Sequence, residues 1–94
     1  MYKRQVCASV NSDVVHGIPG QRVIQAGDIV SIDSGAQFEG WNGDSARTFV
    51  VPGGADAALD ETRRRLNDVT EQSLWHGIAA LASARHLNLS LIHI

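Results

Sequence analysis

The sequence predicts a small α+β domain, in which an antiparallel β-hairpin sheet has one long helix packed on it. Two stretches rich in β-branched residues, joined by a glycine-rich bend, predict the hairpin. A later stretch, in which apolar residues recur at three, four and seven positions, predicts the helix. The chain has 94 residues, of which 44% are hydrophobic and 19% are charged, so we expect at most one globular domain.

The hairpin is expected within Gly27–Gly53, which is the most informative part of the chain. Its two strands are predicted at Asp28–Gln37 and Asp44–Val51. Residues that favour bending are expected to connect them: Gly35, Glu39, Gly40, Asn42 and Gly43.

Each predicted strand carries one carboxylate, Asp33 or Asp44. A turn centred between Phe38 and Glu39 places the two acids directly opposite each other, and a turn centred one residue later makes them diagonal neighbours on one face. Like charges on one face are destabilising unless a cation, a shared proton or solvent compensates. The pair therefore indicates either a divalent metal site or two ordinary acids, one solvated and the other bonded to Arg47 or a backbone amide.

A third strand is predicted upstream, at Gln5–Asn11, with Cys7 and Ser9 on one of its faces. His16 follows at the start of a loop made rigid by Pro19 and flanking glycines. Strand-anchored loops often carry binding residues, so His16 is a candidate functional residue. A purely structural histidine is the alternative.

Two further elements complete the prediction. Gln21–Gln25 is expected to form a short edge segment, and Asp56–Ala82 a long helix capped by Asp56. Arg63–Arg65 is interpreted as part of a solvated face, because three consecutive helical residues do not form one stripe.

Composition excludes several classes of partner. The net charge of −2 gives no reason to expect a nucleic acid or an anionic membrane surface. No apolar run approaches the roughly 20 residues of a membrane span, and no signal peptide is recognisable. The single cysteine, Cys7, cannot form an internal disulfide. We therefore expect a soluble, cytoplasmic protein.

Three segments taken together resemble the type I methionine aminopeptidases, which are metallopeptidases with the pita-bread fold. They are VNSDVVHGIPG (Val10–Gly20), GDIVSIDSGAQFEGWNGDSARTF (Gly27–Phe49) and TEQSLWHGI (Thr70–Ile78). The resemblance covers roughly Val6–Asn88 and implies a partial pita-bread fold.

The resemblance also implies roles for four residues. Asp33 matches an aspartate that chelates one metal ion, and Asp44 matches one that bridges two. His16 matches a catalytic histidine that contacts the scissile amide of the substrate and helps to stabilise the tetrahedral intermediate. Cys7 matches a cysteine that lines the pocket for the methionine side chain. The implied reaction is removal of the initiator methionine by a metal-bridging hydroxide, with two Co²⁺, Mn²⁺, Fe²⁺ or Zn²⁺ ions as cofactors.

The resemblance further implies nascent polypeptide N-termini as substrates, proximity to the ribosome, and a monomeric complete enzyme. In the family, another histidine and two glutamates complete the metal site in the second half of the domain. The 94-residue chain has two of these five ligands, so we expect it to be inactive alone. Two alternatives remain: another pita-bread hydrolase such as a proline dipeptidase, and a non-catalytic binding module with the same fold.

The two ends are expected to be foreign to the domain. One oligonucleotide, GTG TAT AAG AGA CAG, can encode the first five residues with GTG as the start codon, and its reverse complement can encode Leu89–His93. This oligonucleotide resembles a transposon end used in sequencing adapters. We therefore expect residues 6–88 to be the N-terminal half of a catalytic domain, with non-native ends at residues 1–5 and 89–94.

Overall fold

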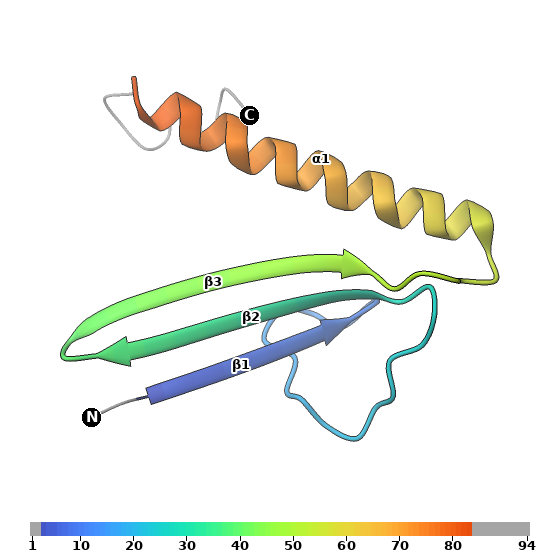
Figure 1. Cartoon of the computed structure of the whole chain (residues 1–94), viewed down its shortest axis with the longest axis horizontal. Helices are drawn as coiled ribbons and strands as arrows, with labels where there is room; N and C mark the ends of the chain where they lie inside the picture. The colour runs from blue at the N-terminus through green and yellow to red at the C-terminus, as the bar shows by residue number, and fades with distance from the viewer. Residues whose placement is uncertain (1–2, 84–94) are drawn as a thin grey trace. The chain divides into compact units, whose positions relative to one another are not determined.

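The computed structural model describes residues 3–83 and contains a three-stranded antiparallel sheet and one helix. The strands lie side by side in the order β1–β2–β3 (Figure 1). The bounds are Lys3–Val10 for β1, Ile29–Phe38 for β2, Trp41–Val50 for β3 and Ala57–Leu81 for the helix α1. The predicted α+β class is confirmed. The expectation for residues 89–94 lies outside the described part of the chain.

A two-residue turn joins β2 to β3. Glu39 and Gly40 both have positive φ, 50° and 81°, as in the type I′ turns that match the twist of paired strands. Pairing continues to Phe38 opposite Trp41, so β3 begins three residues before its predicted start. The bend is thus shorter than predicted: Gly35, Asn42 and Gly43 are paired within the strands.

The buried part of the sheet lies toward the end of β1 and the start of β2. Val30 is fully buried, and Val10 and Cys7 are 5% and 8% exposed. Val10 pairs with Val30, which pairs in turn with Phe49 on β3. This apolar row fixes the register, because a slip by one residue would turn every side chain to the opposite face.

Residues 11–28 form a loop that is tied back to the sheet by polar side chains. The Asn11 side chain donates to Asp28 Oδ1 over 2.9 Å and accepts from the Ile29 amide over 3.1 Å. The predicted edge segment at Gln21–Gln25 is wrong, since none of its residues is in a strand. The reason is local: the Gln25 amide donates to Asp28 Oδ2 over 2.9 Å and makes no ladder bond.

The helix α1 begins and ends within one residue of the predicted bounds. Its N-cap is Asp56, whose Oδ1 accepts from the Leu59 amide over 3.0 Å. No residue of α1 is buried, and no helix in residues 3–83 is long and apolar enough to cross a membrane. The chain divides into two compact units after Arg63, and the packing of the predicted helix on the sheet stays a prediction.

Candidate active site

Asp33 and Asp44 lie diagonally across β2 and β3, on the same face of the sheet. Asp33 pairs with Ala46, and Asp44 pairs with Gly35. This is the second of the two registers anticipated from the sequence, because the turn is centred between Glu39 and Gly40. Diagonal neighbours have Cβ atoms roughly 7–8 Å apart, within reach of a shared ligand. Asp33 is half-buried and Asp44 is exposed.

A hollow of about 150 Å³ brings together all four residues singled out from the sequence. It is lined by Gln5, Cys7, His16, Asp33, Gly35 and Asp44. Gly35 stands between Gln5 on β1 and Asp44 on β3 in the register of the sheet. Because glycine has no side chain, the middle of this row stays open, and the two carboxylates share a common space.

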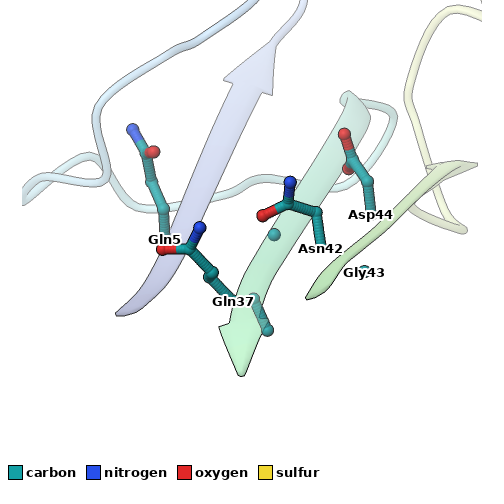
Figure 2. Close-up of a pocket in the computed structure, with 7 residues that line it drawn as sticks. Gln5, Gln37, Asn42, Gly43 and Asp44 are labelled. Carbon is teal, nitrogen blue, oxygen red and sulfur yellow. The ribbon is translucent and has the colours of Figure 1, made fainter. Parts of the chain in front are cut away.

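The same face continues toward the hairpin turn as a second hollow of about 290 Å³. Gln5, Gln37, Asn42 and Asp44 project from the strands on one side of the sheet (Figure 2). Gln37 and Asn42 are direct partners across β2 and β3. Asp44 and Gln5 line both hollows, so the polar surface is continuous with the carboxylate pair.

His16 reaches the site from a loop that is hydrogen-bonded to β1. The Ala8 amide donates to the Gly17 carbonyl over 2.9 Å, and the Gly17 amide donates to Ser9 Oγ over 3.1 Å. The backbone of His16 has φ of 71°, which is uncommon outside glycine and is found at residues held by their surroundings.

The Cys7 thiol forms the buried edge of the hollow. Cys7 pairs directly with Asp33 across β1 and β2, so both side chains are on one face. The thiol is free and only 8% of the residue is exposed. A buried cysteine behaves as a small apolar group, which suits the wall of a pocket for an apolar side chain.

The charge of the carboxylate pair is not neutralised within the described residues. Neither Asp33 nor Asp44 has an ion-pair partner in residues 3–83, and Arg47 makes no bond to either. The same residues contain no group of three or more histidine, cysteine or acidic side chains arranged to hold a metal ion. The two carboxylates fit a divalent cation chemically, but they are an incomplete ligand set.

Three contributors to this site were missed in the sequence. Gln5 and Gly35 line the hollow because they lie two residues from Cys7 and Asp33, a spacing that returns to the same face of a strand. That alternation was a usable signal. No signal in the sequence identified Ser9, because its hydrogen bond to Gly17 depends on how the following loop folds back.

The chain belongs to metallopeptidase family M24, whose sequence profile matches residues 1–92. Divalent metal dependence is a property of this class of peptidase.

The relatives within that family are methionine aminopeptidases. The chain is 47% identical over 90 residues to methionine aminopeptidase of Borreliella burgdorferi, covering 95% of this chain and 34% of that protein. It is 44% identical over 77 residues to methionine aminopeptidase 1 of Bacillus subtilis, covering 82% and 29%. The chain thus spans about a third of the length of these relatives.

A solved structure also matches. The crystal structure of methionine aminopeptidase from Rickettsia prowazekii superimposes with a TM-score of 0.66 at 37% sequence identity, covering 78% of this chain and 27% of that one. The expected partial pita-bread fold is thereby confirmed.

Proposed function

We propose that this chain provides the first part of the active site of a methionine aminopeptidase. The observation that carries the proposal is the diagonal pair of Asp33 and Asp44 in one hollow with Cys7 and His16. The similarity to methionine aminopeptidases over 82–95% of the chain supports the same assignment.

In this proposal Asp33 and Asp44 hold two divalent metal ions, Co²⁺, Mn²⁺, Fe²⁺ or Zn²⁺. Bound metal ions supply Lewis acidity and generate a nucleophile from water at neutral pH. The carboxylates of this chain contribute negative charge and oxygen ligands. Because they stand on two adjacent, paired strands, the sheet fixes the separation between them. The hollow at Gly35 is the space in which both carboxylates would offer their oxygens to the ions.

The other two residues act on the substrate. His16, which lines the hollow with Asp33 and Asp44, would contact the scissile amide and stabilise the negative charge that develops in the tetrahedral intermediate. Cys7 forms an apolar wall that receives the methionine side chain. The anchoring of the His16 loop on β1 holds these two groups in a fixed relation.

We further propose that the complete protein is a cytoplasmic monomer that acts on the N-termini of nascent polypeptides near the ribosome. The net charge of −2 and the lack of a membrane-spanning helix in residues 3–83 are compatible with this proposal. The chain alone is expected to release no methionine, because its described residues offer too few metal ligands.

A chimera tests the function. Residues 6–83 replace the matching segment of the Bacillus subtilis methionine aminopeptidase 1, to which the chain is 44% identical. We expect the chimera to release methionine from a peptide such as Met-Ala-Ser in the presence of Mn²⁺ or Co²⁺. Replacing Asp33 or Asp44 by Asn is expected to lower the rate by more than the roughly 10–100-fold that is lost when a group hydrogen-bonded to a metal ligand is removed. Asp68→Asn, on an exposed part of α1, is the matched control.

The chimera also separates the alternatives. Cleavage of X-Pro dipeptides with no methionine release would identify a proline dipeptidase. Metal binding by a folded chimera with neither activity would favour a non-catalytic binding module. Either outcome would reject the proposal that this chain is part of a methionine aminopeptidase.

A further inference from the structure

One side-chain hydroxyl group, that of Ser9, holds the loop that carries His16 at two of its backbone groups. Ser9 Oγ accepts a hydrogen bond from the Gly17 amide over 3.1 Å and donates one to the Val14 carbonyl over 3.4 Å. The two partners lie on either side of His16 in the sequence, one residue after it and two residues before it. The hydroxyl therefore bridges the base of the short loop on which the imidazole stands.

A close backbone contact reinforces the same point. The Ala8 amide donates to the Gly17 carbonyl over 2.9 Å. A Cβ at Gly17 would overlap the Ala8 carbonyl and lie 3.0 Å from Ser9 Oγ. Only glycine lets the loop approach β1 this closely, and the positive φ of His16, 71°, turns the chain at that position.

Strand alternation explains why Ser9 suits this task. Ser9 lies two residues after Cys7 on β1, so both side chains are on the face that carries Asp33. The hydroxyl thus fixes the loop directly beside the hollow, and His16 lines that hollow together with Cys7 and Asp33.

We propose that Ser9 is a positioning residue, which, with Gly17, places the His16 imidazole over the hollow shared by Cys7 and Asp33. The proposal rests on the proposed function for the importance of His16, but the placement itself is independent of metal and of peptide hydrolysis. Without the hydroxyl, the Gly17 amide and the Val14 carbonyl lose their side-chain partner. The backbone bond from the Ala8 amide to the Gly17 carbonyl remains, but it does not by itself hold the imidazole against the hollow.

The test is nuclear magnetic resonance on the full 94-residue chain, free of metal. The main readout is the nuclear Overhauser effect between the His16 ring protons and the Cys7 side chain. In Ser9→Ala we expect this effect to disappear and the Gly17 amide to exchange with solvent about tenfold faster. The cross-strand effects between Cys7 and Asp33 should be unchanged, which shows that the sheet is intact.

Two variants serve as controls. Ser9→Thr keeps the hydroxyl and is expected to retain the His16–Cys7 effect. Ser34→Ala removes an exposed serine from the opposite face of β2 and should change nothing. An unchanged His16–Cys7 effect in Ser9→Ala would overturn the proposal.

Gly17→Ala provides an independent variant if Ser9→Ala does not fold. Its added methyl group pushes the loop away from the Ala8 carbonyl while Ser9 stays in place. We expect the His16–Cys7 effect to disappear here too, and its persistence would count against the proposal. Because no readout needs metal, failure of Mn²⁺ to bind at Asp33 and Asp44 would challenge only the proposed function.

Discussion

Asp33 and Asp44 are diagonal neighbours across two adjacent strands, with Gly35 directly opposite Asp44. The arrangement separates the two charges more than a directly opposed pair would, while both stay on one face. Gly35 leaves the space between them open. The pair is therefore arranged to share a ligand between the strands.

The first prediction concerns metal binding by the chain itself. We expect weak binding of Mn²⁺, because two carboxylates are present without a third ligand in the described residues. Replacing Asp33 or Asp44 by Asn should abolish it, since either change halves the charge of the pair. Electron paramagnetic resonance of free Mn²⁺ measures the binding, and Asp68→Asn is the control. Equal binding by all four chains would show that the ions are held elsewhere.

The second prediction concerns the open position between the carboxylates. Gly35→Leu should weaken Mn²⁺ binding by about tenfold, the low end of what disturbing the surroundings of metal ligands costs. The new side chain would occupy the hollow that Asp33 and Asp44 share. Ser34→Leu places the same side chain on the opposite face and should leave binding unchanged. Undiminished binding by Gly35→Leu would mean that the ions do not use this space.

The sequence could predict that Asp33 and Asp44 share one face of the sheet, but it left the register open. Strand alternation put Asp33 and Asp44 on one face under both turn placements. A type I′ turn at residues 38 and 39 needs positive φ at Phe38, whereas the observed turn needs it at Gly40, where glycine adopts it readily. The glycines at 35 and 43 suggested a wider bend, yet both are paired within the strands.

Side-chain hydrogen bonds within the loop and between the loop and β1 account for what the sequence did not reveal. The sequence of Gln21–Gln25 is typical of a strand. In the structure the Gln25 amide donates to the Asp28 carboxylate, and Arg22 forms an ion pair with Asp13 over 3.0 Å. Ser9 likewise looked like an ordinary strand residue. Its importance follows from a loop that returns to β1 eight residues later.

The third prediction concerns the hairpin turn. Glu39→Asn should stabilise the chain by about 0.5 kcal/mol, because asparagine tolerates positive φ better and Asn-Gly is favoured in type I′ turns. Urea unfolding followed by circular dichroism measures the change. Glu39→Gln removes the same charge without this backbone preference and should have a smaller effect. Equal stabilisation by both variants would assign the gain to charge.

The fourth prediction concerns pH. The hydrogen bond from the Gln25 backbone amide, followed by that from the Asn11 side chain, lowers the pKa of Asp28 below its ordinary value of 3.8. A group whose pKa is lowered in the folded state stabilises the fold. This stability is fully present at a pH above the pKa of the unfolded state, and it is lost as the pH falls through the pKa of the folded state.

We therefore expect that, below about pH 4, the urea midpoint of the parent chain decreases more steeply with falling pH than the midpoint of Asp28→Asn. The difference between the two chains should shrink as the pH decreases. Asp68→Asn, at an exposed helical site, should follow the parent chain. Parallel curves for the parent and Asp28→Asn would contradict the role of these hydrogen bonds.

The last prediction concerns the junction between the sheet and the start of α1. A Cβ at Gly54 would lie 2.7 Å from the Gly27 Cα and 2.6 Å from Asp60 Oδ2, and Arg63 also donates to the Gly27 carbonyl. Gly54→Ala should therefore destabilise the chain by about 1–3 kcal/mol, since backbone atoms must move. Gly43→Ala is the matched control, because nothing lies within 4 Å of its Cβ position. Urea unfolding of both variants measures the difference, and equal midpoints would show that this close approach does not contribute to stability.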